Sequence, residues 1–235
     1  CGVRRVADGL EIGAATTIEG LRRAGRGETL GPGMTRCLDL FGSHPIRERA
    51  TVAGNIVNGS PIGDLTVLLL ALDAELVVEG AGGQRLVPLT RFFRGYKTLD
   101  LTAGEVVTWV RVPADRLEAR ISFEKVAKRA HLDIATVNSA AAVHGSAAGI
   151  EGVRLSAGGV APVPLRLAAA EAVLTGRAPT ADLWRQAAEA ADDEIAPISD
   201  VRGSAAYKRA LLRRLLWAHG ETLFGLGRAL LDEAG

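Results

Sequence analysis

Cysteine, methionine and aromatic residues are scarce in this chain of 235 residues, which has two cysteines, one methionine and 4% aromatic side chains. Cys1 and Cys37 form no CxxC pair, so neither a disulfide framework nor a cysteine-ligated metal site is predicted. Nor do the histidines show the spacing of a metal site, since they lie at 44, 131, 144 and 219. We therefore expect a reduced, cytoplasmic protein with no metal ligands of its own.

Net charge and long apolar runs are lacking too. The chain carries 28 Lys and Arg against 27 Asp and Glu, a formal net charge of +1, which gives no electrostatic reason to expect binding to nucleic acid or a membrane surface. The longest apolar run, 65–72, is far shorter than the about 20 residues of a transmembrane helix. The first residues show no charged segment followed by an apolar signal core. Small molecules and other proteins remain as partners.

Hydrophobic side chains, in contrast, make up 48% of the chain, enough for a substantial core and for two compact units. Alternation at 10–16 predicts a strand, and Thr16 with Glu19 reads as a capping box that opens a short helix, which the glycines and proline at 28–33 end. Further along, the pattern predicts a helix at 34–41, a hairpin of strands 75–79 and 85–89, and a strand at 104–113.

A polar, charged stretch between Pro113 and Arg120 marks the boundary between two predicted domains, residues 1–117 and 118–235. The second begins with segments typical of an antiparallel meander, at 122–128, 139–145 and 152–160. Helical segments follow at 164–176, at 181–191 with Thr180 as cap, and at 200–216 with a leucine stripe. Strands first and helices after predict an α+β fold class.

The segment 50–72 is the most informative, because small residues lead directly into the most apolar run. Glycines and hydroxyl residues let the main chain approach a bound group closely and offer it N–H donors. Ser60 followed by Pro61 is typical of a helix start. At the head of that helix Asp64 would repel a phosphate, so a hydroxyl is its expected ligand. Local chemistry leaves open that Asp64 is only a cap and the glycines only a turn.

The pattern GlyAsn-x-x-x-GlySerPro-x-x-Asp, from Gly54 to Asp64, resembles the FAD-binding loop of the molybdenum hydroxylase flavoprotein family, which includes xanthine and carbon monoxide dehydrogenases. Similar motifs follow in order through the chain: PhePhe-x-GlyTyr at 92–96, Phe-x-Lys-x-x-x-Arg at 123–129, AspIleAla at 133–135 and Asp-x-Arg-x-Ser-x-x-Tyr at 200–207. The sequence departs from the family's usual GlyGlyAsn, since Ala53 precedes Gly54.

The resemblance implies the second half of a PCMH-type FAD-binding domain, followed by a domain like the C-terminal domain of the CO dehydrogenase flavoprotein, an antiparallel meander plus helices. Bacterial xanthine dehydrogenase small subunits are the nearest relatives it suggests. In that family a further glycine-rich loop, which grips the FAD diphosphate, precedes the point where this sequence starts. Because the chain opens on Cys1, we expect a fragment or one piece of a longer polypeptide.

Nine cofactor-binding residues follow from the resemblance: Phe41, Thr51, Gly54, Asn55, Val57, Ser60, Asp64, Val107 and Lys125. Phe41 would lie against the adenine and Val107 against the isoalloxazine ring. Lys125 would favour anionic reduced flavin. Without the resemblance, Phe41 and Val107 would be assigned to the core, and Lys125 to a solvated strand face.

The function implied is that of a xanthine dehydrogenase-like component, an oxidoreductase that passes electrons from iron–sulfur clusters through FAD to NAD. The molybdenum cofactor and the clusters would belong to partner domains or chains of a hetero-oligomer, so no catalytic residue is assigned here. Leu132 and Asp133 stand where many members carry two adjacent acids, which leaves the acceptor open. The alternatives are a carbon monoxide dehydrogenase-like medium subunit with a quinone acceptor, and a flavin-free assembly module.

Overall fold

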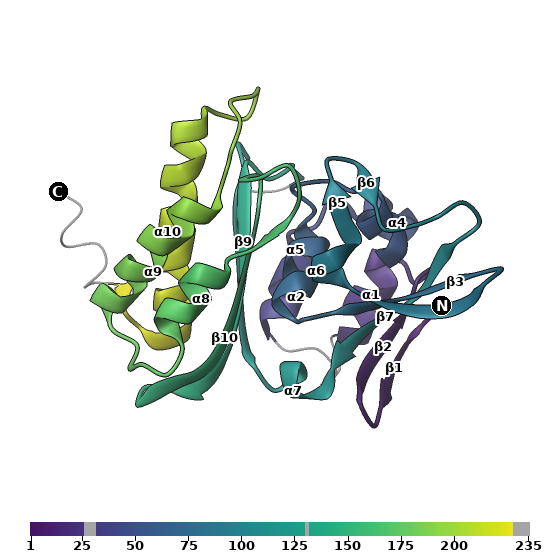
Figure 1. The fold of residues 1–235 in the computed structure, drawn as a ribbon, viewed down its shortest axis with the longest axis horizontal. Helices are drawn as coiled ribbons and strands as arrows, with labels where there is room; N and C mark the ends of the chain where they lie inside the picture. The colour runs from purple at the N-terminus through teal and green to yellow at the C-terminus, as the bar shows by residue number, and fades with distance from the viewer. Residues whose placement is uncertain (26–31, 130–131, 228–235) are drawn as a thin grey trace.

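A computed structural model describes residues 1–25, 32–129 and 132–227, and their chain forms layers in which helices and sheets alternate (Figure 1). The outermost sheet is antiparallel, with strand order β1-β2-β7-β3-β4. Its strands are β1 (Val3–Val6), β2 (Gly9–Gly13), β3 (Glu75–Gly80), β4 (Gly83–Pro88) and β7 (Val106–Pro113). A separate two-stranded ribbon is formed by β5 (Phe93–Gly95) and β6 (Thr98–Leu99).

The described part of the first half also contains six helices, of which α4 and α6 contact this sheet. They are α1 (Ile18–Ala24), α2 (Pro32–Asp39), α3 (His44–Arg49), α4 (Val52–Val57), α5 (Asp64–Ala71) and α6 (Leu89–Phe92). Every residue of α5 is buried. A helix that is apolar on all sides belongs inside the protein, because it has no polar face to turn to water. Accordingly α5 lies between the two sheets and contacts β9 and β10 as well as α4.

The second sheet is also antiparallel, with strand order β11-β10-β9-β8. After the short helix α7 (Ala114–Leu117) come β8 (Arg120–Val126), β9 (Val137–Ser146), β10 (Gly149–Gly158) and β11 (Leu165–Arg166). One face is covered by α8 (Ala168–Leu174), α9 (Ala181–Glu194) and α10 (Ala205–Phe224), and the other face packs on α5 (Figure 1).

Burial on both faces explains the composition of β9. Ala140 and Ala142 belong to the core shared with the first half, whereas Val137, Ala141 and Val143 belong to the core under the helices. A strand that is buried on both faces carries a continuous apolar run instead of an alternating one. The same alternation directs Phe123 of β8 toward the first half and Ser122 toward α10.

The α+β class and the antiparallel meander are confirmed, as are the hairpin of β3 and β4 and the Thr180 cap, which accepts a bond from Leu183 N at 3.1 Å. Two predicted helix starts are wrong. Thr17, not Thr16, caps α1, because the Thr16 hydroxyl is bonded to the backbone of Gly2. Ser60 and Pro61 form a turn, and α5 begins at Asp64 after the N-cap Gly63.

The division into residues 1–117 and 118–235 stays a proposal; residue 117 is the end of α7. The predicted helix end at 28–31 and His131 lie outside the described residues. None of the helices in the described part combines the length and apolarity needed to cross a membrane.

Candidate cofactor site

Residues 52–57 form the helix α4 instead of the open loop that the sequence predicts. The Thr51 hydroxyl caps this helix by accepting a hydrogen bond from Gly54 N at 3.1 Å. The first two N–H groups of the helix also have partners. Val52 N donates to the carbonyl of Thr16 at 2.9 Å, and Ala53 N donates to the carbonyl of Ala14 at 3.0 Å. The expectation of free backbone donors is therefore wrong for these positions, because the β2–α1 connection already uses them.

The surface of α4 is nevertheless open to a ligand. Gly54 and Val57 are exposed, and Thr51 and Asn55 are half-buried beside them. A Cβ at Gly54 would lie 2.8 Å from Thr51 Oγ1, so a side chain there would displace the capping hydroxyl. The backbone at Gly54 therefore stays bare and can be approached closely by a ligand. These residues offer a dinucleotide an open surface and polar side chains, whereas the amides of Val52 and Ala53 are already used.

Asp64, at the start of α5, forms a buried ion pair with Lys125 of β8. Asp64 Oδ2 lies 2.6 Å from Lys125 Nζ, and the side chains are 10% and 7% exposed. The ammonium also donates to the carbonyl of Leu40 at 3.4 Å. Asp64 Oδ1 accepts a bond from Asn138 Nδ2, on β9, at 2.5 Å. Helix α5 and strands β8 and β9 thus meet at the Asp64 carboxylate, and the residue after α2 joins them through the Lys125 ammonium.

Burial and hydrogen bonding both affect the protonation of Asp64 in this pair. Burial raises the pKa of the Asp64 carboxyl, while the Lys125 ammonium and the Asn138 amide act in the opposite direction. Each carboxylate oxygen already has one partner but has two lone pairs, so each retains room for a further donor. Asp64 is consequently a paired acceptor, and its binding of a ligand hydroxyl stays a prediction.

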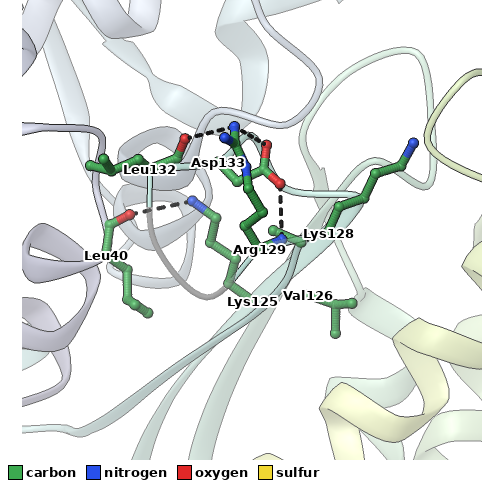
Figure 2. A pocket seen from close by; sticks show the side chains of 8 residues that line it. Leu40, Lys125, Val126, Lys128, Arg129, Leu132 and Asp133 are labelled. Carbon is green, nitrogen blue, oxygen red and sulfur yellow. Dashed lines mark hydrogen bonds and ion pairs between the residues drawn. The ribbon is translucent and has the colours of Figure 1, made fainter.

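Lys125 lines a cavity of about 290 Å³ together with seven other residues: Leu40, Val126, Ala127, Lys128, Arg129, Leu132 and Asp133. Figure 2 shows the Lys125 ammonium turned toward the Leu40 carbonyl and the Lys128 side chain directed away from it. Arg129 lies over Asp133, whose carboxylate accepts from the Arg129 backbone N–H at 3.1 Å (Figure 2). The cavity therefore has one buried cation in its wall and an ion pair above it.

The remaining predicted residues are spread around this centre. Ser60 is half-buried in the turn before α5, where its hydroxyl accepts from Ile62 N at 3.4 Å. Val107 is 9% exposed and belongs to the first core, opposite Val78. Phe41 is partly buried and packs against the same core. The structure joins Thr51 to Gly54 and Asp64 to Lys125 directly, and contact of Phe41 or Val107 with a ring stays a prediction.

The sequence patterns do not indicate Asn138, although it completes the cluster. Lys125 and Asn138 face each other directly across the β8–β9 ladder. Opposite residues of an antiparallel pair lie on the same face, so the register of the two strands was the signal that could have identified it. Within the described residues, no three histidine, cysteine, aspartate or glutamate side chains are arranged to hold a metal ion.

Comparisons with known proteins cover both halves of the chain. Residues 2–115 match the family described as "FAD binding domain in molybdopterin dehydrogenase". Residues 122–219 match the "CO dehydrogenase flavoprotein C-terminal domain". The two matches follow one another in the order that the sequence motifs indicated.

Individual relatives support the same family assignment. The carbon monoxide dehydrogenase medium chain of Hydrogenophaga pseudoflava is 33% identical over 216 residues, 92% of this chain and 75% of the relative. A xanthine dehydrogenase of Emericella nidulans is 35% identical over 142 residues, 60% of this chain and 10% of the relative. The solved carbon monoxide dehydrogenase of H. pseudoflava superposes with a TM-score of 0.88 at 31% identity, over 97% of this chain and 78% of that one. The chain therefore belongs to the FAD-binding flavoprotein family of the molybdenum hydroxylases, a family of oxidoreductase components.

Proposed function

We propose that this chain holds FAD between α4 and the Asp64–Lys125 pair, and that it conducts electrons from iron–sulfur clusters on a partner to an external acceptor. The observation that carries the proposal is the buried Lys125 ammonium in the wall of an accessible cavity. Bound FAD would supply the conversion between one-electron and two-electron transfer. The chain itself would supply position and charge.

Lys125 would provide the positive charge. An ammonium has three donors, and among the described residues two are used, by Asp64 and by the Leu40 carbonyl. One donor is left for a group in the cavity. A fixed cation in a partly desolvated site stabilises negative charge that develops beside it, because no solvent has to reorganise. Asp64 would hold the ammonium in place and accept a ligand hydroxyl with a remaining lone pair.

The residues of α4 and the following turn would contact the rest of the dinucleotide. Thr51, Gly54, Asn55 and Ser60 would line the diphosphate and ribityl portions, with Val57 beside them. Phe41 would pack on the adenine and Val107 on the flavin ring, where an apolar surface excludes water. The open face of α4 and the bare backbone at Gly54 support this arrangement.

As acceptor we propose NAD, in a cytoplasmic hetero-oligomer whose other parts carry the molybdenum cofactor and the iron–sulfur clusters. Arg129, which lines the cavity, is a cation suited to a nucleotide phosphate. A carbon monoxide dehydrogenase-like medium subunit with a quinone acceptor is the second candidate, and it is favoured by the length of the alignment, 92% of this chain against 60% for the xanthine dehydrogenase. Reduction of NAD by the assembled, substrate-reduced enzyme supports NAD as the acceptor. Reduction of a quinone without any reduction of NAD contradicts it.

The cofactor proposal is tested by replacing Lys125 with methionine and measuring the Kd of FAD for the apo-enzyme. Loss of a charge-assisted bond costs about 1.5–3 kcal/mol, so we expect the Kd to rise about 10- to 150-fold. Lys208→Met is the matched control, because Lys208 on α10 is an equally buried lysine, pairs with Asp200 at 2.9 Å and does not line this cavity. Equal Kd values for both variants and the wild type would contradict the role of Lys125, and no FAD in any of them would favour the assembly module.

A further inference from the structure

We infer that Asn138 is a positioning residue for the proposed cofactor site, because its carboxamide fixes Asp64 as the acceptor that holds the Lys125 ammonium at the cavity wall. The inference rests on the proposed function. It concerns a residue that does not line the cavity itself, so its effect on the cofactor would pass through Asp64 and Lys125.

Asn138 is fully buried and uses both protons of its Nδ2. One bond goes to Asp64 Oδ1 at 2.5 Å and the other to the carbonyl of Ile62 at 3.2 Å. Ile62 lies in the turn just before α5, so the same amide group holds the turn and the first residue of the helix. Through it, β9 determines where the carboxylate stands.

The orientation of the amide group follows from its surroundings. A flipped carboxamide would set its oxygen against a carboxylate and a carbonyl, which are both acceptors. In the observed orientation Oδ1 is buried and has no hydrogen-bond partner among the described residues. Leaving a buried acceptor unpaired is unfavourable. The oxygen stays unpaired because this orientation lets both amide protons of Asn138 bond to Asp64 and to the turn before α5. Such a local penalty is typical of a functional constraint.

Gly158 on β10 leaves the space that this orientation needs. A Cβ at residue 158 would lie 2.3 Å from Asn138 Oδ1 and 2.9 Å from the carbonyl oxygen of Pro61. The carboxamide is therefore confined between β10 and the turn before α5. With Asp64 Oδ1 bound to Asn138, Oδ2 is left to Lys125 at 2.6 Å. A continuous chain of hydrogen bonds thus runs from the Ile62 carbonyl through Asn138, Asp64 and Lys125 to the Leu40 carbonyl.

The test uses two substitutions of Asn138 and a control on the same strand. Asn138→Leu keeps the size and removes the donors. Asn138→Asp keeps the shape and can donate to Asp64 only when the new carboxyl is protonated. Ser139→Ala removes two equally buried hydrogen bonds on the opposite face of the sheet, from Ser139 Oγ to the Ser156 carbonyl at 2.8 Å and between Ser139 Oγ and His219 Nε2 at 3.0 Å. Denaturant unfolding of the full chain shows how far each variant loses stability.

Two measurements separate positioning from stability. Carbon-13 NMR of labelled aspartate follows the Asp64 carboxyl, whose pKa should rise in Asn138→Leu, because a donor to its charged form is lost, and stay unchanged in Ser139→Ala. The Kd of FAD for the complete apo-enzyme should rise about 2- to 10-fold in Asn138→Leu. In Asn138→Asp the Kd should approach that of the wild type as the pH falls, a rescue that loss of stability alone would not produce.

The outcomes that overturn the inference are distinct from those that overturn the function. Absence of FAD from the wild-type enzyme would overturn the proposed function, and the role of Asn138 with it. If the wild type holds FAD and Asn138→Leu matches Ser139→Ala in both the Asp64 pKa and the FAD Kd, this inference alone fails.

Discussion

At the scale of single residues, His219 shows how burial sets a protonation state. Its ring lies between Ser122 Oγ, 2.8 Å from Nδ1, and Ser139 Oγ, 3.0 Å from Nε2, in a fully buried position on α10. The Ser139 hydroxyl already donates to the Ser156 carbonyl, so we assign the ring proton to Nε2 and let Nδ1 accept from Ser122. Burial, with a smaller effect of Arg36, lowers the pKa of His219 to about 3.

A pH dependence of stability follows. An unfolded histidine has a pKa of about 6.5, so below that pH the unfolded chain binds a proton that the folded chain excludes. The free energy of unfolding should therefore fall as the pH drops from about 6.5 toward 3, by up to about 1.4 kcal/mol per pH unit. Denaturant unfolding at pH 7, 6 and 5 measures this decrease in the free energy of unfolding. His219→Gln should remove this component, and identical slopes for the variant and the wild type would refute the assignment.

At the scale of elements, Asp73 links the end of α5 to the second half of the chain. Its carboxylate accepts from Arg154 of β10 at 2.7 Å, from Arg166 of β11, and pairs with Arg116 of α7 at 3.0 Å. The residue has a φ of 48°, a backbone conformation that aspartate and asparagine tolerate better than most residues. Burial raises the pKa of Asp73, but Arg154 and Arg166 outweigh it and hold that pKa below its usual value.

Asp73→Asn should lower the free energy of unfolding by about 1–2 kcal/mol, because three arginines lose a common charged partner while the backbone remains compatible. Asp115→Asn is the matched control: Asp115 pairs with the same Arg116 at 3.5 Å but its side chain is 64% exposed, so its loss should change stability by less than about 0.5 kcal/mol. Equal effects of the two substitutions would show that the three-arginine cluster does not link the elements.

Individual helices and strands differ in how well sequence patterns predict them. The hairpin of β3 and β4 and the meander follow from alternation and glycine turns, which are local signals. Helix α4 could not be predicted, because six residues that include a glycine and two valines form a helix only with the Thr51 cap and the distant carbonyls of Ala14 and Thr16. Asn138 was missed for a related reason: strand register, not local sequence, brings it to Asp64.

At the scale of the whole molecule, the candidate site lies where the two halves meet. Lys125 and Asn138 belong to the second sheet, and Asp64 to the central helix that both sheets cover. Neither half alone contains the complete cluster. The resemblance of the motifs therefore identified Asp64 and Lys125 as residues of one site, whereas their mutual pairing emerged only from the folded chain.

Flavin content decides whether this chain holds FAD. The most direct measurement is the visible absorbance of the purified complete enzyme, with flavin quantified per chain, for the wild type and for Asp64→Ala. We predict one FAD per chain in the wild type and a clear loss of flavin in the variant, because removing Asp64 releases Lys125 from the cavity wall. Full flavin occupancy in Asp64→Ala, or a wild-type enzyme without flavin absorbance, would contradict the account.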